Sequence, residues 1–221
     1  MRQQSGCAAA RSERSHVADQ TISAFLEELA ARTPAPGGGA VAALQAAQAA
    51  ALLAMVARYS DGPRSAGHAE LVASVLAEAD QLRAECVALI TADAEAFGSV
   101  AVAYTLPKDT AEQKAVRSAA IAAALIPATA PPAEVVAACG RLLGLAAALR
   151  PVANRSVIGD LAAAVASIRA AAATGRINME ANLTGITDPA ARAHYREVAA
   201  GVDDLLARAD AVTADVRAEL A

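Results

Sequence analysis

The sequence predicts an all-α protein, a single-domain bundle of about seven to eight helices, one of them long. Three observations predict this fold class. Alanine dominates the apolar residues, which make up 56% of the chain, and only 2% of the residues are aromatic. Alanine is the best helix former, whereas strands favour branched and aromatic side chains. Apolar residues also recur at spacings of three and four, the period of a buried helical stripe.

The first two expected helices flank a proline- and glycine-rich breaker. We expect the first helix at about 21–32, with Asp19 or Thr21 as its N-cap. The segment 33–39 interrupts the pattern, and an alanine-rich helix then runs to about Tyr59. Residues 1–18 are polar and lack the apolar stretch of a signal peptide, so we expect a flexible N-terminal tail followed by one helical domain over 19–221.

The middle of the chain predicts one long helix and a shorter one. After a turn over 60–67, the helical pattern continues from about 68 to 104 and stops at Leu106 and Pro107. Asp109 or Thr110 is positioned to cap the next helix, with Glu112 in its first turn. Proline cannot donate a backbone hydrogen bond, so we expect this helix to end near 126. The residues expected to break it are Pro127, Pro131 and Pro132.

The remaining helices are expected at about 133–149, at 157–173, and from 189 to near the C-terminus. The stretch 173–188 has the least regular pattern of the second half. No internal repeat or linker is visible, and this favours a single domain.

Composition argues against several functional classes. The net charge is −4, and the 19 basic residues are scattered among 23 acidic ones, so we expect no nucleic-acid partner. Cys7, Cys86 and Cys139 lie far apart without histidines at ligand spacing, and this predicts neither a disulfide nor a metal site. Isolated thiols are typical of a reducing, cytoplasmic compartment.

The segment 40–57 is long enough to span a membrane, but we interpret it as a buried bundle helix and expect no membrane partner.

Two features suggest a site for an anionic ligand or for acid/base chemistry. The run from Pro34 to Gly39 directly precedes a helix, where backbone N–H groups and the helix dipole favour a carboxylate or phosphate. A tight turn that needs close backbone approach or positive φ explains these glycines equally well. Asp93 falls near the apolar stripe of the longest helix, whereas Glu95 should face outward. A buried carboxylate is a candidate general acid or base, although a partly exposed surface acid is the simpler alternative.

Several polar residues in the second half leave structural and functional roles open. Asp160 near the start of a helix fits a plain N-terminal cap as well as a site residue. Asn154, Asn178 and Asn182 lie between apolar runs, and most such asparagines form turns. If their segment is helical, Asn178 and Asn182 share one face.

Together, five segments resemble one family. TISAFLEELAARTPAPGGGAVAALQAAQAA, DAEAF, LPKDTAEQKAVR, ANRSVIGDLAAA and INMEANLTGITD occur in the order and approximate spacing of the cyclodeaminase/cyclohydrolase family. That family comprises formiminotetrahydrofolate cyclodeaminase, the C-terminal half of formiminotransferase-cyclodeaminase, and the stand-alone methenyltetrahydrofolate cyclohydrolase. The likeness covers about residues 21–188.

The resemblance implies a helical homodimer that binds a reduced folate and uses no metal or redox cofactor. It implies that Asp93, with Asp160 second, is the catalytic acid/base. The residues implied to bind the substrate are Pro36, Gly37, Gly38, Gly39, Ala40, Lys108, Arg117, Asn154 and Asn182. The implied reaction is hydrolysis of 5,10-methenyltetrahydrofolate to 10-formyltetrahydrofolate, or cyclisation of 5-formiminotetrahydrofolate with loss of ammonia. We favour hydrolysis, because no formiminotransferase segment accompanies this sequence.

The chain also departs from the family pattern. Ala40 and Gly159 stand where serine is usual, Ala153 replaces glycine, and Arg64 is the nearest basic residue in a segment that is more basic in the family. These departures leave an alternative open, a catalytically silent helical dimer that binds a folate-like or other small ligand as a scaffold. Asp93, Lys108 and Asp160, which are retained, favour the enzyme.

Overall fold

The computed structural model describes residues 17, 20–62 and 67–221, and within them the chain is helical and contains no strand. This confirms the predicted all-α fold class. Nearly all of the expected tail, the alternative cap Asp19 and the departure at Arg64 lie outside the described residues. The elements are α1 (Ile22–Ala30), α2 (Gly38–Tyr59), α3 (Ala69–Tyr104), α4 (Ala111–Leu149), the short 3₁₀ turns η3 (Arg150–Val152) and η4 (Arg155–Val157), α5 (Ile158–Leu183), α6 (Pro189–Ala200) and α7 (Val202–Leu220).

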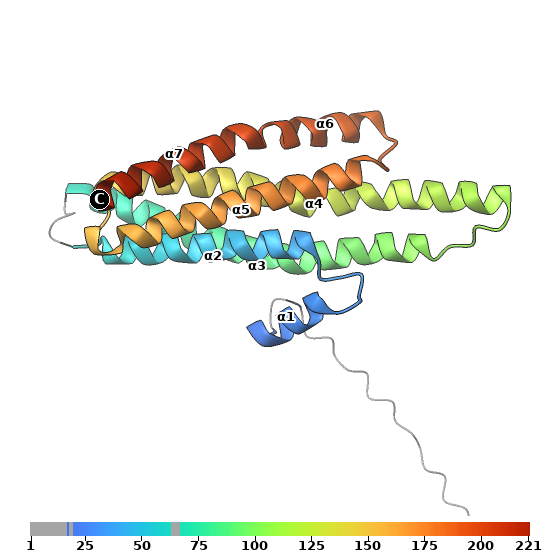
Figure 1. The fold of residues 1–221 in the computed structure, drawn as a ribbon, viewed down its shortest axis with the longest axis horizontal. Helices are drawn as coiled ribbons and strands as arrows, with labels where there is room; N and C mark the ends of the chain where they lie inside the picture. Colours follow the sequence, from blue (N-terminus) through green and yellow to red (C-terminus); the bar gives the residue numbers. More distant parts are fainter. Residues whose placement is uncertain (1–16, 18–19, 63–66) are drawn as a thin grey trace, which may run out of the picture.

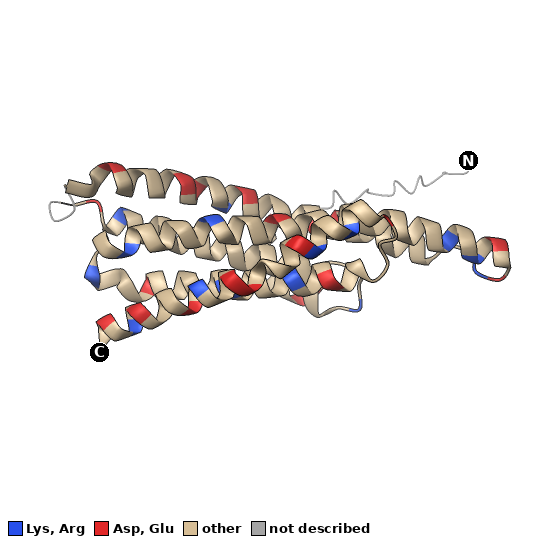
Figure 2. Ribbon diagram, turned by 90° about the horizontal axis from the view of Figure 1, so that it is seen from above, with Lys and Arg blue, Asp and Glu red and all other residues tan. Residues whose placement is uncertain are grey.

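Four long helices run alongside one another to form an elongated bundle (Figure 1). α2 packs against α3, α4 and α5, and α7 packs along α5. α3 and α4 form a hairpin that projects beyond the other helices, while the short α1 lies outside the bundle (Figure 1). Basic and acidic residues are interspersed along the helices (Figure 2).

Alanine allows the close packing around α2. Along this helix, alanines at nine positions are fully or almost fully buried, and Leu53 and Val56 join them in the core. Small side chains let helix axes approach to the near end of the usual range of about 8–10 Å. By length and composition alone, four stretches of the described chain are long and apolar enough to cross a membrane, namely 38–59, 69–104, 111–152 and 155–183. In α2 the apolar stretch is 61% buried inside the protein, as expected for a central bundle helix.

The predicted capping residues form the expected hydrogen bonds. The Thr21 side chain accepts a hydrogen bond from the backbone N–H of Ala24, at 3.1 Å. Thr110 caps α4 and forms a reciprocal capping box with Gln113. Short polar side chains at these positions satisfy N–H groups that the first turn leaves unpaired.

The predicted break near 126 is wrong, because α4 continues from Ala111 to Leu149 through all three prolines. Pro132 has no N–H to donate to the carbonyl of Ala128, one turn earlier. The side chain of Asn182 on α5 replaces that donor, with Nδ2 3.2 Å from the Ala128 oxygen. The donor lies 54 residues away in sequence, so a local rule about proline cannot anticipate it.

Two further helix predictions are corrected. α5 does not end at 173 but continues to Leu183, so most of the stretch expected to be irregular is helical. The final predicted helix is divided at Gly201 into α6 and α7. The extension of α5 matters for function, because it places Asn178 and Asn182 on one face of a helix.

Gly175 provides a test of the packing between α4 and α5. A Cβ atom at this position would lie 3.0 Å from the Pro132 oxygen and 3.1 Å from Cγ2 of Val136. We predict that Gly175→Val lowers the free energy of unfolding by about 1–3 kcal/mol through overpacking. Gly144→Val is the matched control, because Gly144 lies on exposed α4 surface with open space around it. Equal stability of the two variants in urea denaturation would contradict the close contact.

Candidate active site

The glycine-rich loop and Asp93 lie together at one small cavity of about 160 Å³. The loop before α2 forms one wall, α3 supplies Asp93 and Phe97, α4 supplies Ala128 and Pro132, and α5 completes the cavity. The α5 residues that line it are Asn178, Ala181 and Asn182. Four segments that are distant in sequence therefore converge on one carboxylate.

Glycine is needed at position 39 because no space remains there for a side chain, and not because the backbone has a positive φ. No described glycine has a positive φ, so of the two structural explanations for the glycine run, only close approach applies here. A Cβ atom at Gly39 would collide with the carboxylate of Asp93, and one at Gly38 would lie 3.0 Å from Nδ2 of Asn178. Gly37 has open space around it. The last two glycines thus let α3 and α5 side chains approach the start of α2.

The environment of Asp93 brings the pKa of its carboxyl group closer to neutral pH. Burial raises its pKa from 3.8 to about 6, and a hydrogen bond from the backbone N–H of Ala40 lowers it in part. Ala40 lies in the first turn of α2, where the positive end of the helix dipole also favours an anion. The hydrogen bond comes from the backbone, so alanine in place of serine at position 40 preserves it. Glu95, as predicted, faces outward and is exposed.

The two asparagines on α5 are held by backbone carbonyls. Nδ2 of Asn178 donates to the Thr174 oxygen at 2.8 Å, and Nδ2 of Asn182 donates to Ala128. These bonds fix the orientation of both amide groups against the cavity. Of the two, only Asn182 was predicted to bind substrate. The spacing of four residues was the signal for Asn178, but its use required knowing that the segment is helical.

Lys108 and Arg117 lie at the tip of the α3–α4 hairpin and not at the cavity. Tyr104 ends α3 there, and eleven residues of helix separate it from Asp93, about 17 Å along the axis. Nε and Nη2 of Arg117 donate to the Tyr104 carbonyl at 3.2 Å, and its guanidinium lies 5.2 Å from the centre of the Tyr104 ring. Lys108 is exposed in the turn.

Asn154 and Asp160 lie at the opposite end of α5 from the cavity. Asn154 joins the turn after η3 to the end of α2, because its Nδ2 donates to the Tyr59 carbonyl and its backbone N–H donates to the Ser60 hydroxyl, both at 2.9 Å. Asp160 is in the first turn of α5, whose N-cap is Val157, so the interpretation of Asp160 as the cap is wrong. Eighteen residues of helix, about 27 Å, separate Asp160 from Asn178. Ala153 and Gly159 lie at this same end, away from Asp93.

The cavity therefore includes only part of the predicted set. Three glycines, Asp93 and Asn182 line it, while Pro36 is buried in the loop and Ala40 hydrogen-bonds Asp93. Pro34, from the glycine-rich run, lines the cavity too, whereas sequence reasoning did not identify Phe97, Ala128, Pro132, Asn178 and Ala181 as site residues. Most of these are small apolar residues, which carry no chemical signature in sequence.

Comparison with known proteins places this geometry in context. The sequence profile described as formiminotransferase-cyclodeaminase matches residues 21–201. The methenyltetrahydrofolate cyclohydrolase of Methylorubrum extorquens is 36% identical over 195 residues, which are 88% of this chain and 92% of that protein. The formimidoyltransferase-cyclodeaminase of Rattus norvegicus is 30% identical over 77% of this chain, and the matched part is 32% of the rat protein.

A solved structure supports the fold. The crystal structure of formiminotetrahydrofolate cyclodeaminase from Thermotoga maritima superposes with a TM-score of 0.76, covering 91% of this chain and 96% of that one at 24% sequence identity.

The raised pKa of Asp93 predicts how stability depends on pH. Below about pH 4 the carboxyl is protonated in both folded and unfolded states. Between pH 4 and 6 the unfolded chain ionises first, so the parent loses stability, and above the folded pKa of about 6 this loss stays constant. Asn keeps the acceptor for Ala40 but does not titrate. We predict that Asp93→Asn is more stable than the parent at pH 7 by roughly 1–3 kcal/mol.

Urea denaturation at pH 4 and pH 7 measures this difference, which should be much smaller at pH 4. A constant difference across this range would show that Asp93 titrates alike in both states.

Proposed function

The chain belongs to the formiminotransferase-cyclodeaminase family, and we propose that it hydrolyses 5,10-methenyltetrahydrofolate to 10-formyltetrahydrofolate with Asp93 as the acid/base. The observation that carries this proposal is the position of a partly desolvated carboxylate against the N-terminus of α2, inside a cavity. The greater similarity to a cyclohydrolase over nearly its whole length favours hydrolysis over cyclodeamination.

The chemistry needs only a positioned carboxylate. The substrate carries a positive charge on the carbon that bridges N5 and N10. Asp93, ionised, takes a proton from water as the oxygen bonds to that carbon, which gives a neutral tetrahedral adduct. The bond from carbon to N5 then breaks, N5 receives the proton from Asp93, and the hydroxyl proton of the adduct leaves to solvent as the formyl group forms. The net change is addition of water with release of one proton, so we propose that neither metal nor redox cofactor takes part.

A pKa of about 6 suits both halves of this cycle. A general base works best when its pKa is near the working pH, because it is then mostly ionised and still returns the proton readily. The nearby negative charge also stabilises the cationic substrate. Before the substrate binds, the Ala40 N–H and the α2 dipole offset that charge. The same carboxylate would serve cyclodeamination, in which N10 attacks the formimino carbon and ammonia leaves.

We further propose that two copies of the chain assemble around the substrate. The cavity in one chain, about 160 Å³, is smaller than the roughly 300–1,000 Å³ of typical ligand pockets. Three large apolar side chains near the tip of the α3–α4 hairpin, Val102, Tyr104 and Val116, are more than half exposed, and such surfaces are typical of interfaces. A second copy is also the simplest way for Lys108, Arg117, Asn154 and Asp160 to contribute to a shared site.

Turnover tests the role of Asp93 directly. We predict that Asp93→Asn lowers kcat/KM for hydrolysis by about 100-fold or more, because the amide cannot accept the proton. The absorbance of methenyltetrahydrofolate at mildly acidic pH, corrected for unassisted decay, measures the rate. Glu95→Gln is the matched control, since Glu95 is an exposed carboxylate two residues away on α3. Asp93→Asn turnover within a few-fold of the parent would reject the assignment. A parent that never exceeds unassisted decay would favour the silent scaffold.

A mixing experiment tests whether the site is shared between copies. If Asp93 of one copy and Asp160 of the other form one site, a heterodimer of Asp93→Asn and Asp160→Asn contains one intact site. Random re-pairing of the two inactive variants should then restore roughly a quarter of the parental activity. No recovery after denaturation and joint refolding would contradict a shared site, and an active Asp160→Asn homodimer would remove Asp160 from the proposal.

A further inference from the structure

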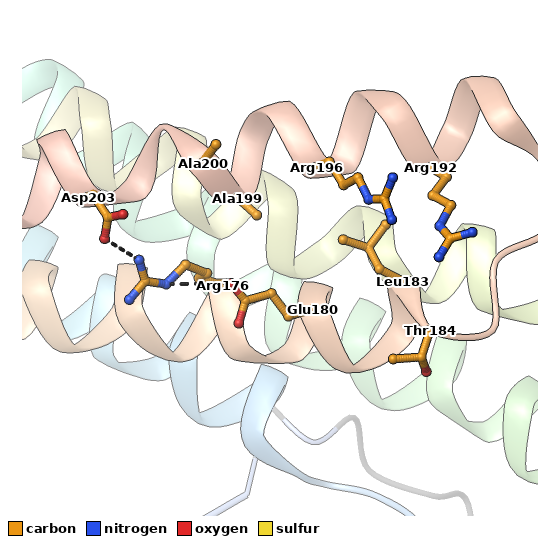
Figure 3. Close-up of a pocket in the computed structure, with 9 residues that line it drawn as sticks. All are labelled: Arg176, Glu180, Leu183, Thr184, Arg192, Arg196, Ala199, Ala200 and Asp203. Carbon is orange, nitrogen blue, oxygen red and sulfur yellow. Dashed lines mark hydrogen bonds and ion pairs between the residues drawn. The ribbon is translucent and has the colours of Figure 1, made fainter.

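A second hollow lies on the face of α5 opposite the candidate active site. Its volume is about 400 Å³, and it is bounded by the end of α5, by α6 and by the start of α7 (Figure 3). Arg176, Glu180 and Leu183 line it from α5, at helical positions opposite those of Asn178 and Asn182, and Thr184 at the end of the helix joins them. Three of its lining residues are arginines, and Leu183, Ala199 and Ala200 are its apolar members.

The two acidic residues that line this groove both form ion pairs with the same one of its three arginines. Arg176 forms ion pairs with Asp203 and, at 4.0 Å, with Glu180 (Figure 3). Within the part of the chain that the structure describes, Arg192 and Arg196 take part in no ion pair. They lie four residues apart on α6, so their like charges face the same side and repel each other.

Arg192 also contains a donor without an acceptor. Its Nε is shielded from solvent and finds no hydrogen-bond partner among the described residues. A buried polar group left unpaired costs free energy, and the cost is larger for a charged group. The side chains of Arg192 and Arg196 both extend from α6 toward α5, above Leu183 and Thr184 (Figure 3). An anion placed between their terminal N–H groups would relieve the repulsion.

We propose that this groove is a binding site for a small multivalent oxyanion, a phosphate or polycarboxylate compound, held by Arg192 and Arg196. Guanidinium groups present two parallel N–H donors that match the oxygen atoms of carboxylate and phosphate. Two such groups one helical turn apart fit an anion with two charged groups. Arg176 closes the other end of the groove, and its own acidic partners keep it in place. The site is separate from the cavity of Asp93 and does not depend on the proposed hydrolysis.

Isothermal titration of the full chain with inorganic pyrophosphate, and separately with citrate, tests the proposal at low salt. We expect one saturable site for at least one probe, and the tighter probe identifies phosphate or carboxylate as the preferred chemistry. Arg192→Gln and Arg196→Gln should each weaken binding about tenfold or more. Arg208→Gln is the control, because it removes the same charge from an exposed arginine on the neighbouring α7 that pairs with Asp204.

Circular dichroism of each variant confirms that its helices remain folded, and Arg196, which is exposed, can be changed without disturbing packing. Arg192→Lys keeps the positive charge but loses the two parallel N–H donors of the guanidinium group. This variant should bind the anion with intermediate affinity. Absence of saturable binding for both probes would overturn the proposal. Equal weakening by Arg208→Gln would also overturn it, because it would show attraction by overall charge alone.

Discussion

The close approach of the Asp93 carboxylate to the backbone of Gly39 is the constraint on which the site depends. A side chain at residue 39 would occupy the space of the carboxylate, so the helix α3 can place its acid at the start of α2 only where the partner has no Cβ. That contact brings the Ala40 N–H to the acid and shields the acid partly from solvent. The alanines of α2 serve the same geometry, because they let three neighbouring helices pack closely around it.

The position of Asp93 lowers the stability of the fold at neutral pH, and this is the cost of placing a carboxylate suited to acid/base chemistry. An aspartate with a raised pKa is held in a place where its charge is poorly solvated, and no cation among the described residues compensates it. Proteins accept such a cost mainly at functional sites. A proline of α4 also shapes the cavity. Pro132 lines the cavity with an apolar ring, and the carbonyl it leaves unpaired is the group that orients Asn182 toward the cavity.

Local features of the sequence were sufficient for much of the fold. Composition predicted an all-α protein, and Thr21 and Thr110 act as caps because capping depends on residues within one turn. That Asp93 and the glycine loop belong to one site was implied by the family resemblance and not by a local feature, and the two do lie together. The continuation of α4 was not anticipated, because Asn182 supplies its missing donor from another helix. The distance of Lys108, Arg117 and Asp160 from the cavity could not be predicted either, because it depends on how the long helices pack against one another.

The central claim is that the carboxyl group of Asp93 is desolvated against Gly39 and Ala40 and changes its protonation near neutral pH. The most direct measurement is an NMR titration of the Asp93 side-chain carboxyl carbon, assigned by comparison with Asp93→Asn. The structure predicts a pKa of about 6. A midpoint near the ordinary aspartate value of about 3.9 would show that the carboxyl is solvated, and would contradict both the geometry and the role derived from it.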